Sequence, residues 1–139
     1  MSMTYEALRS AVLRRSAAIG VTPGTAAMQT MTLGVMAMAE DLPANLKEQL
    51  VAAERRWLAP VDPLPVLTAG RVAAWQFLGA KNADSTTIED RVDIAVRALI
   101  CVLWDEADEG SEMEDGLEFF AQLAERYGGL EQVLGLGMP

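Results

Sequence analysis

The amino-acid sequence predicts an all-α protein, a compact bundle of about six helices. Residues that favour helices, namely alanine, leucine, methionine, glutamate and arginine, are abundant along the whole chain. Apolar residues recur with helical spacing, and no segment keeps the alternation of a β-strand. Short polar or proline-containing segments separate the helical stretches, which favours antiparallel neighbours within one bundle.

The first two predicted helices lie in the N-terminal third of the chain. The first covers residues 4–18, and Gly20 follows its end. The second covers residues 23–40, with Thr22 as its N-cap and a proline at the first helical position. Its apolar residues fall on two faces, and we expect neighbouring helices to cover both. One face carries Met28, Met31, Val35 and Met38, and the other carries Leu33 and Met36.

Two further helices are predicted in the middle of the chain. The third covers residues 43–58 and is amphipathic, with its inward positions at Leu46, Leu50, Ala53 and Trp57. Prolines at positions 60, 63 and 65 then predict a stiff connection. The fourth helix covers residues 64–80, and its predicted inward residues are Leu67, Val72, Trp75 and Leu78.

The fifth predicted helix, residues 88–106, is the central one, because residues 94–104 form the most apolar stretch of the chain. Arg97 is the only charged residue in that stretch. A charge inside such an apolar helix needs a partner, so we expect Arg97 to be partly buried and paired with Asp93, four positions earlier.

The sixth predicted helix covers residues 111–127 and ends before a pair of glycines. Ser111 and Glu114 have the spacing of a capping box, in which each side chain accepts a hydrogen bond at the start of the helix. The apolar residues of this helix again form one inward face.

The length of 139 residues predicts a single domain over residues 1–139, and an apolar content of 51% is sufficient for a core. Residues 21–39 carry no charge, but they include several polar side chains, so we expect a buried core helix and no contact with a membrane. The N-terminus lacks a positive region followed by an apolar core, so we expect no signal peptide.

The net charge of −9 is distributed unevenly along the chain. Residues 1–83 hold eight Lys/Arg and six Asp/Glu, whereas residues 84–139 hold three Lys/Arg and fourteen Asp/Glu. Binding to nucleic acid requires clustered Lys and Arg, so nucleic acid is excluded as the expected partner. The acidic half favours a basic protein as the partner.

Most of this negative charge lies in residues 105–118, which contain eight carboxylates and no Lys or Arg. An aromatic residue beside a charged surface is typical of the anchor of a protein–protein interface. We therefore predict that the partner-binding residues are Trp104, Asp105, Glu106, Asp108, Glu109, Glu112, Glu114, Asp115 and Glu118. The alternative interpretation is a solvated acidic loop that keeps the protein soluble.

The sequence contains no histidine, which excludes Ser-His-Asp and Cys-His catalysis. The single cysteine, Cys101, falls in an apolar helix and is expected to be an inert core residue. One cysteine also excludes an internal disulfide, which favours a reducing compartment such as the cytoplasm. We therefore predict a protein that is not an enzyme and uses no cofactor.

A magnesium-dependent nucleotide hydrolase is an alternative. The patterns Asp105-Glu106-x-x-Glu109 and Glu112-x-x-Asp115 resemble the carboxylate motifs of all-helical nucleotide pyrophosphohydrolases. In those enzymes a longer stretch separates the two motifs, and here no Lys or Arg accompanies them to hold a phosphate. The pattern of a calcium-binding loop is also absent, so we predict no metal site.

Two blocks of sequence, residues 71–81 (RVAAWQFLGAK) and 93–106 (DIAVRALICVLWDE), resemble small helical immunity proteins of bacterial toxin–immunity systems, including contact-dependent inhibition. The resemblance implies a protein that stays in the cytoplasm of the producing cell and blocks one cognate toxin. Many such toxins are basic nucleases. It would account for an acidic protein without an evident active site.

The sequence thus predicts an immunity-type inhibitor that neutralises a cognate toxin by binding it through the acidic surface. Besides the hydrolase, one other alternative is a helical adaptor or secretion chaperone. Such a protein would bind a segment of its client through an apolar groove, and that binding would persist in high salt.

Overall fold

The computed structural model describes residues 3–60, 62–80 and 90–128. These residues form an all-α bundle with no β-strand among them, which confirms the predicted fold class. The elements are α1 (Met3–Ile19), α2 (Pro23–Ala37), a short 3-10 helix η1 (Ala39–Asp41), α3 (Ala44–Trp57), α4 (Thr68–Ala80), α5 (Arg91–Ile100) and α6 (Gly110–Tyr127). None of these helices is both long and apolar enough to cross a membrane.

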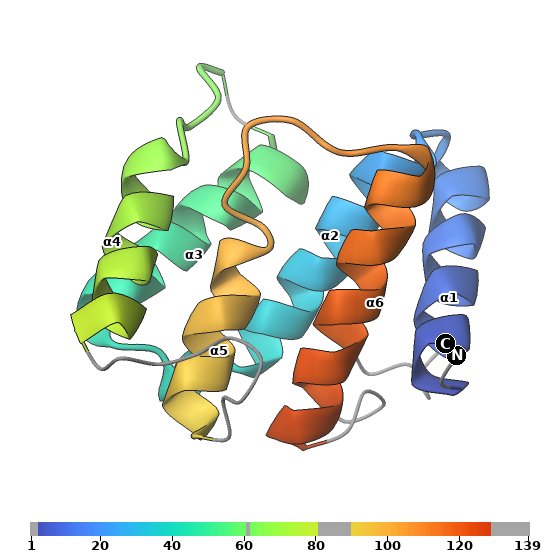
Figure 1. Ribbon diagram of the computed structural model, residues 1–139. Coiled ribbons are helices and arrows are strands. Elements are labelled where there is room, and N and C mark those ends of the chain that lie inside the picture. The colour runs from blue at the N-terminus through green and yellow to red at the C-terminus, as the bar shows by residue number, and fades with distance from the viewer. Residues whose placement is uncertain (1–2, 61, 81–89, 129–139) are drawn as a thin grey trace.

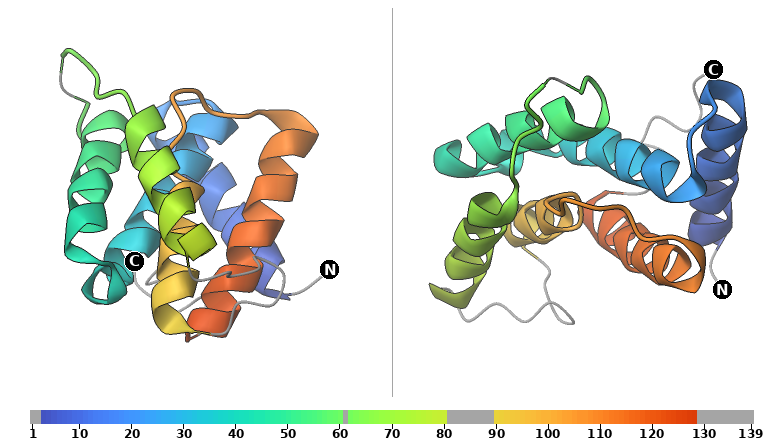
Figure 2. Two further views of the ribbon diagram at one scale, coloured as in Figure 1. Left: turned by 60° about the vertical axis from the view of Figure 1, so that its left-hand side comes forward. Right: turned by 90° about the horizontal axis from the view of Figure 1, so that it is seen from above.

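The helices are arranged in two layers with one helix at the end (Figure 1, Figure 2). Seen from above in Figure 2, α2 and α3 form one layer, and α4, α5 and α6 form the other. Helix α1 stands at one end, where it packs against α2 and α6. Helix α2 contacts α1, α3, α5 and α6, so it lies at the centre of the packing.

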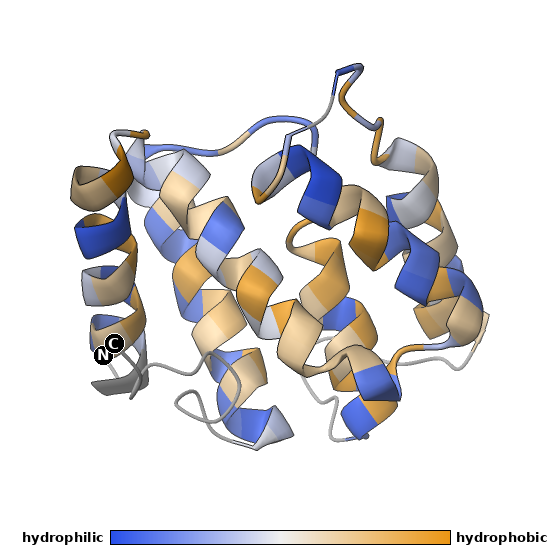
Figure 3. Ribbon diagram, turned by 180° about the vertical axis from the view of Figure 1, so that it is seen from behind, coloured by the Kyte–Doolittle hydropathy of each residue, from blue (hydrophilic) through white to orange (hydrophobic). Residues whose placement is uncertain are grey.

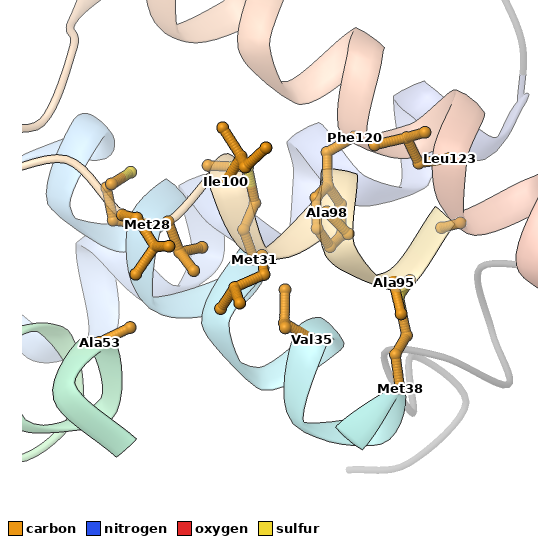
Figure 4. Packing of buried hydrophobic residues seen from close by; sticks show 14 of the residues in the cluster. Met28, Met31, Val35, Met38, Ala53, Ala95, Ala98, Ile100, Phe120 and Leu123 are labelled. Atoms are coloured by element: carbon orange, nitrogen blue, oxygen red, sulfur yellow. The ribbon is translucent and has the colours of Figure 1, made fainter. Parts of the chain in front are cut away.

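The core lies between α2 and the layer of α5 and α6 (Figure 4). The predicted stripe of α2 is buried as expected, and it faces Ala95, Ala98 and Ile100 of α5. Thr22 caps this helix as predicted, since its side chain accepts a hydrogen bond from the backbone N–H of Thr25. Local sequence therefore determines where α2 begins, and the apolar stripe determines which face of α2 is buried.

Not every apolar face is covered. Leu33 and Met36 of α2 remain 40% and 39% exposed, although we expected neighbouring helices to cover them. Figure 3 shows from behind how apolar α2 is along its length. Val72 and Trp75 of α4 were also expected to face inward, and they are 48% and 43% exposed. Among the described residues, α4 packs mainly against α3 and α5, at one edge of its layer.

Three helices have bounds that differ by three residues or more from the predicted ones. Helix α2 ends at Ala37 rather than at position 40, and the 3-10 helix η1 follows it. Helix α4 begins at Thr68 rather than at position 64, because the proline-containing segment before it does not take up helical structure. Helix α5 begins after Asp90, whose carboxylate accepts hydrogen bonds from the backbone N–H groups of Val92 and Asp93. The predicted start of this helix at Ile88 lies outside the described residues.

Helix α5 also ends at Ile100, six residues before its predicted end at Glu106. Residues 101–109, which we call the crossing loop, run from the end of α5 over the bundle to the start of α6 (Figure 1). Val102 and Leu103 at its start are fully buried, so this part of the loop belongs to the core. The crossing loop carries the first half of the predicted acidic surface, and α6 carries the second half.

Candidate binding site

Asp105 ties the crossing loop to the start of α4. Its Oδ1 atom accepts a hydrogen bond of 2.9 Å from the backbone N–H of Leu67, and its Oδ2 atom accepts one of 3.3 Å from the Thr68 hydroxyl. Arg56 of α3 donates to the backbone carbonyl of Asp105 and lies 4.0 Å from its carboxylate. A carboxylate at a helix N-terminus is also favoured by the helix dipole. Asp105 therefore links the crossing loop to α3 and to the start of α4, while its side chain remains 38% exposed.

Glu109 has the same role at the start of α2. Its Oε1 atom accepts a hydrogen bond of 2.8 Å from the backbone N–H of Gly24. This N–H belongs to the first turn of α2 and has no partner within the helix. Glu109 therefore anchors the far end of the crossing loop, and the loop joins the N-termini of two helices through its carboxylates.

Glu114 forms an ion pair with Arg9 of α1, with a distance of 2.7 Å between Oε1 and Nε. The expected capping box does not form, because α6 already begins at Gly110 and its N-cap residue, Glu109, makes no side-chain capping bond. Glu114 is directed instead to the contact between α1 and α6. Three of the eight predicted partner-binding carboxylates are thus engaged within the protein.

The other five carboxylates are exposed and form no hydrogen bond or ion pair within the described residues; they are Glu106, Asp108, Glu112, Asp115 and Glu118. Trp104, the predicted aromatic anchor, is 46% exposed. Arg71 of α4 lies against it, with its Cζ atom 4.1 Å from the centre of the indole ring, and donates a hydrogen bond of 2.7 Å to the Leu103 carbonyl. One face of the Trp104 ring is therefore packed against Arg71, and the ring remains partly open to solvent.

A pocket of about 210 Å³ lies beside Trp104. Residues of α2, α4, α5, α6 and the crossing loop line it. Its apolar walls include the buried side chains of Met28, Met31, Ile100 and Met113. Three of the unpaired carboxylates also line it, namely Glu106, Asp108 and Glu112.

Arg97 lines the same pocket and is half-buried, as predicted, but it does not pair with Asp93. Its guanidinium lies between two aromatic rings, with Cζ 4.8 Å from the centre of Trp75 and 4.5 Å from that of Phe119. The Nε atom is buried and has no hydrogen-bond partner. No carboxylate of the described residues forms an ion pair with Arg97.

Cys101 follows Arg97 by one helical turn and also lines the pocket. Burial raises the pKa of its thiol to about 11, although the positive charge of Arg97 acts in the opposite direction. The Arg97 Nη1 atom approaches the Cys101 sulfur at 3.9 Å, which is a weak contact. A thiol with such a raised pKa is almost entirely protonated at neutral pH and is a poor nucleophile.

Glu106, Asp108 and Glu112 line the pocket, whereas the carboxylates that bind elsewhere in the fold are Asp105, Glu109 and Glu114. Within residues 3–60, 62–80 and 90–128 there is no group of three or more Asp, Glu or Cys side chains placed to hold a metal ion. Asp105 and Glu109, which belong to one of the two hydrolase-like patterns, are directed to the N-termini of different helices.

Reasoning from the sequence did not identify the aromatic partners of Arg97. Trp75 was assigned to the core, and Phe119 lies on a helix more than twenty positions away along the chain. The available signal was Arg97 itself, a lone charge in an apolar helix. No match was found when the chain was compared with models of protein families, with curated proteins and with solved structures.

Proposed function

We propose that this protein is an immunity-type inhibitor that acts in the cytoplasm and neutralises a basic protein, in particular a cognate toxin, by direct binding. The observation that carries the proposal is the set of five exposed carboxylates that have no partner among the described residues, next to the half-exposed ring of Trp104. Trp104 with Glu106, Asp108 and Glu112 forms the centre of this surface, which we call the acidic face.

The acidic face has two properties that favour binding to a cationic cleft. The mutual repulsion of neighbouring carboxylates decreases when a partner brings positive charge to them. Complementary charge also raises the association rate of two proteins. An aromatic anchor supplies apolar contact area at the centre of an interface. Inhibition then requires no chemistry, because an occupied cleft excludes the substrate of the toxin.

The surroundings of the acidic face lower the cost of binding. Arg71 holds the Trp104 ring in place, and the ends of the crossing loop are fixed by Asp105 and Glu109. A loop that is ordered before binding loses less conformational entropy when the partner arrives. The three internally paired carboxylates thus support the proposal indirectly, since they position the unpaired ones.

Charge reversal of the acidic face tests the proposal. The partner is first isolated from the native host by affinity capture and identified by mass spectrometry, and its dissociation constant is then measured by calorimetry. The triple variant Glu106→Lys, Asp108→Lys, Glu112→Lys is compared with the matched control Glu6→Lys, Glu40→Lys, Glu48→Lys. The control makes the same change in net charge at exposed carboxylates of α1, η1 and α3.

We expect the triple variant of the acidic face to lose at least about a hundredfold in affinity for a basic partner, because its three lysines then repel the positive charges of the partner. The control should lose much less. Binding should also weaken in high salt, since charges are screened over about 3 Å at 1 M ionic strength. Equal affinities of the two variants, or a partner retained in high salt, would exclude the acidic face as the docking surface and favour a client groove.

A further inference from the structure

The half-buried guanidinium of Arg97 has no anionic partner within the described residues. A charge removed from water normally requires a counter-charge and hydrogen bonds, and an unsatisfied buried N–H group is costly. The rings of Trp75 and Phe119 offset part of this cost through cation–π contacts, but they accept no conventional hydrogen bond from Nε. The guanidinium can therefore accept an anion that the described residues do not supply.

The pocket that contains Arg97 is suited to a small molecule. Its volume of about 210 Å³ lies below the ~300–1,000 Å³ of clefts that hold drug-sized ligands. Its walls combine apolar side chains, such as Met28, Met31 and Met113, with a small number of charged groups. This combination of an apolar body and few polar groups is typical of ligand sites.

The charges of the pocket have both signs. Arg97 is positive, whereas Glu106, Asp108 and Glu112 are negative and exposed. A simple anion would gain from Arg97 but would be repelled by three carboxylates, and a simple cation would gain from the carboxylates but be repelled by Arg97. A ligand with one positive and one negative group and a short apolar group can contact Arg97, the three carboxylates and the apolar walls at the same time.

We propose that this pocket binds an apolar α-amino acid, with its carboxylate on the guanidinium of Arg97 and its ammonium group toward Glu106, Asp108 and Glu112. The apolar side chain of the ligand packs against Met28, Met31 and Met113. Trp75 and Phe119 keep the guanidinium in position for the carboxylate, which planar arginine recognises with two parallel hydrogen bonds. The site shares Glu106, Asp108 and Glu112 with the acidic face, but binding of an amino acid requires no protein partner.

Calorimetric titration of the full-length protein with L-leucine, L-methionine and L-phenylalanine tests the proposal. Tryptophan fluorescence gives a second readout, since Trp75 and Trp104 line the pocket. The amino acid that binds best is then compared with two analogues, one that lacks the ammonium group and one that lacks the carboxylate. We expect saturable one-to-one binding of the amino acid and a loss of about tenfold or more with each analogue, because each omits a charge-assisted contact.

Two variants connect the binding to this pocket. Arg97→Met keeps an apolar stem but removes the charge, so it should weaken the amino acid about tenfold or more and leave the analogue without a carboxylate unaffected. Gly116→Leu places a side chain at the pocket from an exposed position of α6, where a Cβ atom has no neighbour within 4 Å, so the protein should still fold. It should abolish binding, whereas the control Gly79→Leu on α4, which has equal space and lies outside the pocket lining, should not.

The absence of saturable binding for all three amino acids at millimolar concentration would overturn the proposal. So would undiminished binding in Gly116→Leu, or binding of either analogue as tightly as the amino acid. These results do not involve the protein partner, so failure here is distinguishable from failure of the acidic face as a docking surface. Loss of binding on Gly116→Leu with retained capture of the protein partner would support both assignments.

Discussion

The backbone N–H of Gly24 donates a hydrogen bond of 2.8 Å to the carboxylate of Glu109, across a separation of 85 positions in the sequence. The two segments approach so closely that a Cβ atom on Gly24 would lie 2.1 Å from the Asp108 carbonyl oxygen and 2.2 Å from Glu109 Oε2. Contacts this short do not occur with real side chains. The glycine is therefore required for the crossing loop to lie on the N-terminus of α2.

We expect Gly24→Ala to lower the free energy of unfolding by about 1–3 kcal/mol, because the added methyl group must displace backbone as well as side chain. Denaturant unfolding measures this change. The control is Gly79→Ala on α4, where a Cβ atom meets nothing within 4 Å and alanine should be neutral or stabilising by up to about 1 kcal/mol. Equal stability of the two variants would contradict the close packing of the crossing loop.

Asp105 and Asp108 both belong to the acidic run of residues 105–118, but their mutation should change the stability of the protein by different amounts. Asp105→Ala removes the acceptor of the Leu67 N–H and the Thr68 hydroxyl, so we expect a loss of about 1–3 kcal/mol in the free energy of unfolding. Asp108→Ala removes an exposed carboxylate without a partner among the described residues and should change stability by about 0.5 kcal/mol or less. If both variants unfolded at the same denaturant concentration, the anchoring role of Asp105 would be excluded.

The end of α5 shows where reasoning from the sequence stops. The apolar run through Trp104 predicts a helix, and local propensity gives no reason to end it at Ile100. Side chains from other helices provide a reason, because they donate hydrogen bonds to backbone carbonyls of residues 102–105 and so stabilise the non-helical path of this segment. Trp57 Nε1 donates to the Val102 carbonyl, Arg71 to that of Leu103 and Arg56 to that of Asp105. These partners lie 32 to 49 positions earlier in the sequence, so no local pattern reveals them.

The sequence also predicted only part of the candidate site. Composition identified the acidic run and its neighbouring tryptophan, because charge and aromatic content are properties of the sequence itself. The division of the run into anchoring and unpaired carboxylates depends on which helix N-termini lie nearby, which only the packing determines. Arg97 was expected to form an ion pair with Asp93 on the same helix. Its guanidinium instead contacts aromatic rings of α4 and α6.

The C-terminal end of α6 should make the stability of the protein depend on alkaline pH. The Tyr127 hydroxyl donates a hydrogen bond of 2.5 Å to Asp41, and Arg91 lies over its ring at 3.9 Å. Burial, and then the hydrogen bond to Asp41, raise the pKa of Tyr127 above its ordinary value of 10.0. The native state thus holds the hydroxyl proton more tightly than the unfolded state. This contribution to stability is complete below about pH 10 and is lost as the pH rises through the native pKa.

Ultraviolet absorbance and denaturant unfolding between neutral pH and pH 11 check this expectation. The tyrosinate absorbance of Tyr127, obtained as the difference between the native protein and Tyr127→Phe, should appear only above pH 10. The variant should be less stable than the native protein at neutral pH, and the difference should shrink as the pH rises. A difference that is independent of pH would show that the hydroxyl proton does not contribute to the contact with Asp41.

Cys101 is the single cysteine of the chain, so its reactivity can be followed without interference from other thiols. Its pKa of about 11, against an ordinary value of 9.0, means that the native protein contains about a hundredfold less thiolate at neutral pH than the unfolded chain. We expect alkylation by iodoacetamide to be slower in the native protein by about tenfold or more, because the smaller amount of thiolate is partly offset by the higher nucleophilicity of a thiolate with a raised pKa. Arg97→Met should slow it further, because the positive charge that lowers the thiol pKa is then removed.

The pH profile of the alkylation rate separates this electrostatic effect from simple shielding of the sulfur. A raised pKa predicts a rate that continues to rise up to about pH 11 in the native protein, whereas the chain unfolded in denaturant should reach its plateau near pH 9. Circular dichroism at each pH verifies that the helices persist. A plateau near pH 9 in the folded protein would mean that burial blocks access to the sulfur without raising its pKa, and the expected effect of Arg97→Met would then be absent.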